Sequence, residues 1–139
     1  WMENGIDEIT LADTASAVAE DITLGARGSV VVTDQSALTL VHATLASALG
    51  NQLTTDASGA RIRLANSIVG AGRFGSANCI APAGAVESLG GNVFQDTAPC
   101  ALTPLPSDQI VDNLHLIEAT APSPVPLLGV HNIAAPMKV

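Results

Sequence analysis

The segment Leu38-Thr-Leu-Val-His-Ala-Thr-Leu45 is matched in pattern, 24 residues later, by Ile62-Arg-Leu-Ala-Asn-Ser-Ile-Val69. A third and less regular copy follows at Val86-Glu-Ser-Leu-Gly-Gly-Asn-Val-Phe94. A period of about 20–30 residues suits one coil of a β-solenoid, in which three short strands and three turns stack on the next coil. The repeat therefore predicts an all-β fold, a right-handed parallel β-helix of few coils.

Short runs in which aliphatic residues alternate with polar ones, or which are β-branched, support this fold, because they are typical of half-buried strands. A turn-forming residue follows each run. The runs cover residues 9–11, 22–24, 30–33, 38–40 and 61–64. We expect the alternate residues to point into one continuous column, formed by Ile9, Leu11, Ile22, Leu24, Val30, Val32, Leu38, Leu40, Ile62, Leu64 and Val69.

Two Ala-rich segments leave a helical alternative open. Residues 13–20, with Asp13 as a candidate N-cap, and residues 43–49 could each form a short helix, because alanine favours helices. Beyond Cys100 the chain is rich in proline, which interrupts regular strand ladders. We therefore expect β-helix coils over residues 1–100 and an extended C-terminal cap or tail over residues 101–139.

The composition limits the classes of function. The chain has 139 residues, of which 13 are acidic and five are basic, so its net charge of -8 would repel a nucleic-acid backbone. No apolar run reaches the roughly 18–20 residues that span a bilayer. We expect no nucleic-acid partner and no membrane span. Because the sequence begins at Trp1 without a signal peptide, we interpret it as a mature or processed product.

The stretch from Ile62 to Leu102 resembles a known family. It contains Leu-Ala-Asn66-Ser-Ile-Val, then Asn78-Cys79, then Glu87-Ser-Leu-Gly-Gly-Asn92-Val-Phe, then Cys100-Ala-Leu. This order is similar to the C-terminal coils of right-handed parallel β-helix proteins of bacterial surfaces, of the choice-of-anchor Q type. Ser107-Asp108 and Pro126-Leu-Leu-Gly129 look similar to segments that follow in that family. The resemblance implies the fold and export to the cell surface or the extracellular space, and it implies no particular activity.

The two cysteines fit either one disulfide or two buried thiols on composition alone. From the spacing around the Ser-Leu-Gly-Gly-Asn turn we predict a disulfide between Cys79 and Cys100, which would close a loop of 22 residues. Asn66 and Asn92 are candidates for coil corners, because asparagine tolerates left-handed backbone angles and its side chain can form ladders between stacked turns. The simplest interpretation of both is a turn residue without a ligand.

No motif predicts catalysis or a metal site. Gly70-Ala-Gly-Arg-Phe-Gly75 has the spacing of a dinucleotide-binding turn, but Pro82 follows in the region where a helix would be needed. The acidic residues of the N-terminal third are spread over turns rather than paired. His42, His115 and His131 share no ligand spacing. We therefore expect no enzyme, no metal and no cofactor.

We expect a non-catalytic structural or binding module of an exported bacterial surface or filament protein. An uncapped solenoid end leaves backbone groups unpaired, and the Pro-rich tail can cover only the C-terminal end. We therefore expect the first coil, with Trp1, Ile6, Ile9 and Leu11, to contact other protein, either a neighbouring subunit or an upstream part of the same precursor. The alternative is the C-terminal part of a polysaccharide-active β-helix enzyme, a lyase or a glycoside hydrolase, which would make polysaccharide a partner.

Overall fold

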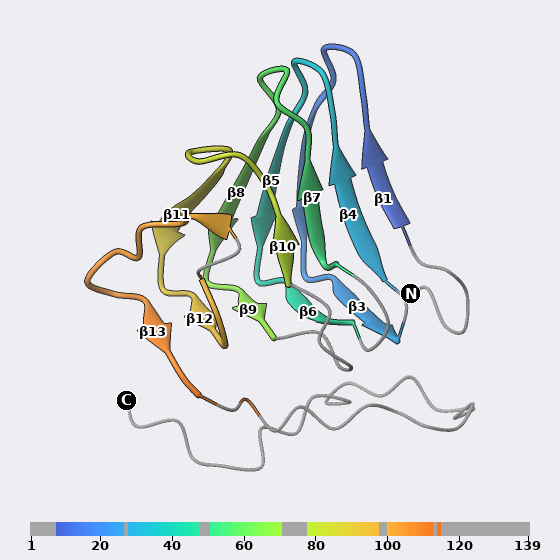
Figure 1. The fold of residues 1–139 in the computed structure, drawn as a ribbon. Coiled ribbons are helices and arrows are strands. Elements are labelled where there is room, and N and C mark those ends of the chain that lie inside the picture. The colour runs from blue at the N-terminus through green and yellow to red at the C-terminus, as the bar shows by residue number, and fades with distance from the viewer. Residues whose placement is uncertain are drawn as a thin grey trace, which may run out of the picture.

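The computed structural model describes residues 8–26, 28–47, 51–70, 78–97, 100–112 and 114. In these ranges the chain forms short strands and no helix, and parallel pairing winds the strands into a β-solenoid (Figure 1). The fold class predicted from the repeat is confirmed. Within the described ranges, no helix is long and apolar enough to cross a membrane.

Each coil contributes one strand to each of three sheets. Sheet A contains β1 (Glu8–Leu11), β4 (Ser29–Val32), β7 (Leu53–Thr55) and β10 (Cys79–Ile80). Sheet B contains β2 (Ser16–Glu20), β5 (Ala37–Val41), β8 (Arg61–Ala65) and β11 (Val86–Gly90). Sheet C contains β3 (Thr23–Ala26), β6 (Thr44–Ser47), β9 (Ile68–Val69), β12 (Val93–Phe94) and β13 (Gln109–Ile110).

The strand register reproduces the sequence repeat. Leu38 pairs with Ile62, and Ile62 pairs with Val86, so the three copies lie directly above one another in sheet B. The same offset continues into sheet C, where Leu45 pairs with Val69. The pattern match therefore identified residues that are neighbours in space, one coil apart.

The core is the expected column of aliphatic side chains. Leu24, Val30, Val32, Leu38, Leu40, Ile62, Leu64 and Val69 are buried in one cluster, and Ile9, Leu11 and Ile22 pack against it while partly exposed. A coil made of three short strands encloses a narrow interior, which small and medium aliphatic residues fill. This explains why the chain needs few aromatic side chains.

In two segments the structure decides against the helical alternative that the sequence left open. Within the Ala-rich segments, residues 16–20 and 44–47 form strands β2 and β6, because each pairs along its length with a strand of a neighbouring coil. In β2, Ala19 pairs with Leu40 and packs against the common core. Strand pairing and core packing therefore outweigh the helix propensity of alanine. Within the expected tail, β13 adds a further strand to sheet C by pairing with β12.

Candidate functional site

The first coil is distinguished by the partial exposure of its inward-facing residues. Ile9 pairs with Val30 and Leu11 pairs with Val32; both valines are fully buried, whereas Ile9 and Leu11 are only half-buried. Ala19 shows the same difference from its fully buried partner Leu40. The cause is positional, since β1, β2 and β3 each pair with a described strand on one side only. This end of the solenoid, formed by β1, β2 and β3, is called the open end below.

Among the described residues, backbone groups at the open end also lack a neighbouring strand. The Thr33 N–H donates to the Leu11 carbonyl, and the Asp21 N–H donates to the Val41 carbonyl. In a parallel ladder successive residues alternate between their two neighbouring strands. The N–H and C=O groups of every second residue of β1, β2 and β3, among them Thr10, Val18 and Thr23, therefore point away from the second coil. These are the groups that a further parallel strand would bond.

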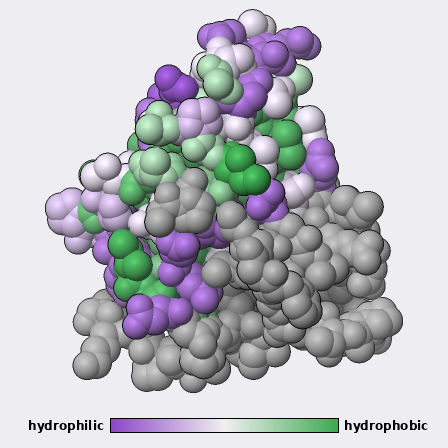
Figure 2. Space-filling view, viewed as in Figure 1, coloured by the Kyte–Doolittle hydropathy of each residue, from purple (hydrophilic) through white to green (hydrophobic). Residues whose placement is uncertain are grey.

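A column of aspartates lies at the turn between sheets A and B. The Asp13 N–H donates to Asp34 Oδ2 at 3.1 Å, and the Asp34 N–H donates to Asp56 Oδ2 at 3.0 Å. Asp13 and Asp34 have φ angles of 62° and 59°, a left-handed conformation that aspartate tolerates. Each carboxylate thus bonds the backbone of the coil before it. Figure 2 shows hydrophilic residues gathered at the top of the view, where these turns lie in Figure 1.

Hydrogen bonding stabilises the charged form of the last member of this column. The Ser58 hydroxyl and the Asp34 N–H both donate to Asp56, and these bonds lower the pKa of Asp56 below its ordinary value. A general acid for glycoside hydrolysis needs a raised pKa, the opposite perturbation. The lowered pKa therefore favours a charged Asp56 carboxylate that holds the turn together, and it does not suit a general acid.

The first coil is acidic around its rim. Between residues 8 and 26 it carries Glu8, Asp13, Glu20 and Asp21, and those residues include no lysine or arginine. Asp21 lies 3.4 Å from His42 of the second coil, and both side chains are largely exposed. The open end thus combines a half-buried apolar centre with a negatively charged border.

At the turn between sheets B and C, left-handed residues stack on one another. Their φ angles are 53° at Asp21, 51° at His42, 49° at Asn66 and 72° at Gly91. Asn66 is thus a left-handed corner residue, and a Cβ atom at Gly91 would collide with its side-chain oxygen. In the next coil the left-handed backbone lies at Gly90 and Gly91, so for Asn92, the residue that follows, only the left-handed part of the prediction is wrong.

Asn92 instead occupies the interior of this corner, where it is fully buried. Its Oδ1 accepts a hydrogen bond of 2.9 Å from the Ser67 N–H, and its Nδ2 donates to the Leu64 carbonyl at 2.9 Å. Below it, Asp108 Oδ1 accepts from the Asn92 N–H at 2.9 Å. The side chain therefore connects three successive layers of the solenoid.

Asp108 connects the last coil to the segment that covers it. Its Oδ2 accepts from the Ser88 hydroxyl at 2.6 Å and from the Leu105 N–H at 2.7 Å. Partial burial acts to raise the pKa of Asp108, but these bonds and those from Asn92 outweigh it and lower the pKa. The carboxylate is consequently held in its charged form at the C-terminal end.

A disulfide closes the same end covalently. Cys79 of β10 is bonded to Cys100, with 5.1 Å between their Cα atoms, so the predicted pairing is confirmed. Cys100 and Leu102 are buried in the common core. Residues 100–112 thus cover the core at the C-terminal end, although β10, β11 and β13, like β1–β3, each pair with a described strand on one side only.

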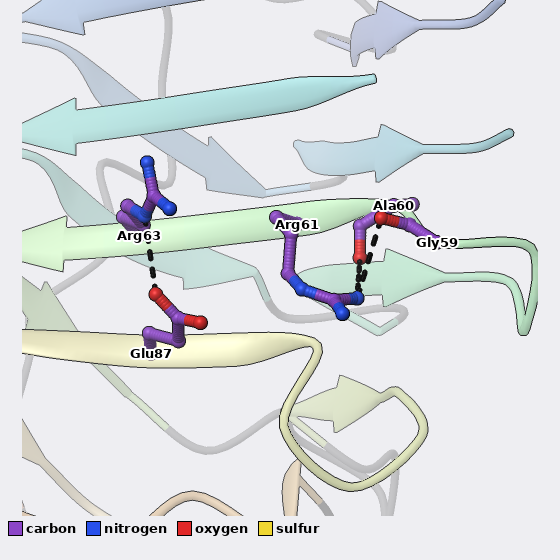
Figure 3. A network of polar contacts seen from close by, with 5 residues as sticks. All are labelled: Gly59, Ala60, Arg61, Arg63 and Glu87. Atoms are coloured by element: carbon purple, nitrogen blue, oxygen red, sulfur yellow. Dashed lines mark hydrogen bonds and ion pairs between the residues drawn. The ribbon is translucent and has the colours of Figure 1, made fainter. Parts of the chain in front are cut away.

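The outer face of sheet B carries the two described arginines. Arg63 Nε donates to Glu87 Oε2 at 3.1 Å, while Arg61 Nη1 donates to the carbonyls of Gly59 and Ala60 (Figure 3). Both side chains of the Arg63–Glu87 pair are about half exposed, so the pair contributes little net stability. Both arginines are therefore solvated surface side chains whose charged groups interact with neighbouring groups of this chain.

Several predicted positions lie outside the described residues. These are Trp1 and Ile6 of the expected interface, residues 71–75 of the glycine-rich motif, His115 and His131. The other expected interface residues, Ile9 and Leu11, lie together at the open end. In the part of the chain that the structure describes, no group of three or more His, Cys, Asp or Glu side chains is arranged to hold a metal ion.

Sequence reasoning missed the aspartate column and the role of Asp108. Asp13, Asp34 and Asp56 recur at nearly the period of the coils, and this spacing is the signal that could have found them. Asp108 gives no such signal, because Ser67 and Asn92, which occupy the equivalent position in the two preceding coils, are different residue types.

The class that the fold defines is a parallel β-solenoid with one capped and one open end. The chain matches no protein-family model, and no curated protein or solved structure matches it.

Proposed function

We propose that this chain is a non-catalytic structural module of an exported bacterial surface or filament protein, and that it assembles with other protein through its open end. The observation that carries the proposal is the exposure of inward-facing Ile9, Leu11 and Ala19, whose partners in the second coil are fully buried. An apolar surface bordered by unpaired strand edges is a template for pairing with another chain.

Two further features support the exported, structural part of the proposal. The Cys79–Cys100 disulfide is typical of oxidising compartments such as the cell surface. The carboxylates of Asp34, Asp56 and Asp108 are engaged by hydrogen bonds that hold the coils together. Polar groups used in this way stabilise a scaffold rather than act on a substrate.

Amide hydrogen exchange of the free chain tests whether the end is open. We expect the edge amides of Thr10, Val18 and Thr23 to exchange at least about tenfold faster than the internal amides of Val30 and Ile62, which donate to the next coil. Exchange at Thr10, Val18 and Thr23 as slow as at Val30 would show that this chain already covers its own end, and the proposal would fail.

A further inference from the structure

We infer that the partner at the open end is a further β-coil, stacked parallel to β1–β3, with a neutral or basic rim and a backbone N–H placed over the carboxylate of Asp13. This inference rests on the proposed function, because it specifies what the open end binds. Three features carry it: the direction of the aspartate column, the edge pattern of the strands, and the charge of the first coil.

The aspartate column has a direction. Asp34 accepts the N–H of Asp13, and Asp56 accepts the N–H of Asp34, so each carboxylate reaches one coil toward the open end. Asp13 occupies the same left-handed turn position as Asp34 but, among the described residues, nothing donates to its carboxylate. The next member of the column would supply that donor as a backbone N–H from a turn stacked above Asp13.

The strand edges specify a parallel partner. All described pairings in the three sheets are parallel, and the free groups of Thr10, Val18 and Thr23 continue that alternation. A coil that runs in the same direction meets all three edges at once and covers Ile9 and Leu11 with its own inward-facing residues. An isolated strand would meet a single edge and would leave the other two unpaired.

Charge disfavours a second copy of this chain as the occupant. Two open ends brought together would oppose Glu8, Asp13, Glu20 and Asp21 of one copy to the same four acids of the other, which is unfavourable. The C-terminal end of a second copy is acidic as well, because residues 100–112 include Asp108 and Asp112 and no lysine or arginine. A coil with a neutral or basic rim can pair with β1–β3 without bringing like charges together.

The test uses a synthetic peptide that copies the chain's own second coil, residues 29–47, with Val41→Lys to place an ammonium group opposite Glu20, its pairing partner. Added to the isotope-labelled full chain, it should slow exchange at Thr10, Val18 and Thr23 by about tenfold or more. The companion Val41→Glu peptide should bind roughly two- to tenfold more weakly, and added salt should reduce that difference.

Matched variants test the aspartate contact. In the protein, Asp13→Gly keeps the left-handed φ of 62° but removes the carboxylate, so it should fold normally and lose most of the peptide-induced protection. In the peptide, an ester in place of the Asp34 amide removes the N–H donor without the fixed negative φ of proline, and it should have the same effect. A peptide of reversed sequence should give no protection.

Equal protection by the reversed peptide, or unchanged binding by Asp13→Gly, would overturn the inference. So would failure of every peptide to protect the edge amides, or sedimentation of the free chain at low salt as a dimer that protects the same amides. In each of these cases fast edge exchange in the monomer would leave the proposed function standing. Slow edge exchange in the monomer would remove the proposed function itself.

Discussion

Ser67 and Asn92 lie one above the other at the turn between sheets B and C, and the Ser67 N–H donates a 2.9 Å hydrogen bond to the buried side-chain oxygen of Asn92. Asn92→Ala would leave this N–H and the Leu64 carbonyl without partners inside the protein. We expect a loss of about 2–4 kcal/mol in the free energy of unfolding. Urea denaturation measures it, with exposed Asn66→Gly as a control that should change stability by less than about 1 kcal/mol.

Gly91 tests the close contact between two successive corners. Gly91→Ala adds a Cβ that collides with the side chain of Asn66, whereas Gly84 has a similar φ of 78° with open space around it. We expect Gly84→Ala to cost about 1 kcal/mol from backbone strain and Gly91→Ala to cost clearly more. The double variant Asn66→Gly, Gly91→Ala should recover most of the difference in thermal unfolding. No recovery would mean that backbone strain alone limits Gly91.

Two inward-facing leucines, Leu11 of β1 and Leu40 of β5, compare the exposed first coil with the closed part of the core. Leu40→Ala creates a cavity in the closed part of the core and should cost about 2–5 kcal/mol. Leu11→Ala removes a side chain that is already half-exposed, and it should cost about 1–2 kcal/mol. Equal losses in denaturant titrations would contradict the description of Leu11 as part of an open end.

Acid should loosen the C-terminal cap. The pKa of Asp108 is lowered in the folded chain, so its contribution is fully present above the unfolded value of about 3.9 and is lost as the pH falls through the folded pKa. We expect exchange protection at the amides of Asn92 and Leu105 to decrease below about pH 4, and Asp108→Asn to remove that dependence. The same Asn variant at neutral pH should lose about 1–2 kcal/mol.

Removing the disulfide should destabilise the cap most. Paired substitutions Cys79→Ser and Cys100→Ser release a loop whose ends are 21 residues apart in sequence, which by chain entropy costs about 3 kcal/mol. We expect reduced wild type and the double variant to show the same midpoint of urea denaturation. A wild-type midpoint that reductant does not change would show that the bond adds no stability.

The fold could be predicted from the sequence because one coil of a solenoid resembles the next. Leu38 and Ile62 occupy the same position in successive coils, so the pattern that selects core residues also repeats along the chain. The corner at Asn92 could not be predicted in the same way. Its partners Ser67 and Asp108 differ chemically from Asn92 while occupying stacked positions, so no residue type recurs to mark the corner.

The helical alternative for residues 13–20 failed for a related reason. Local alanine propensity carries no information about Leu40, the long-range neighbour that Ala19 meets in the next coil. The open end is likewise a property of position. Ile9 and Leu11 have the same pattern as Val30 and Val32, and only the absence of a described strand beyond β1 sets them apart.

The parallel stacking also has a mechanical consequence. Hydrogen bonds between strands of one sheet point along the stacking direction. Tension along the rod is therefore carried, between each pair of adjacent coils, by the hydrogen bonds of all three sheets together. Near the C-terminus the Cys79–Cys100 link adds a covalent bond to that load path. Under axial tension the rod should therefore part among its earlier coils, which no disulfide links.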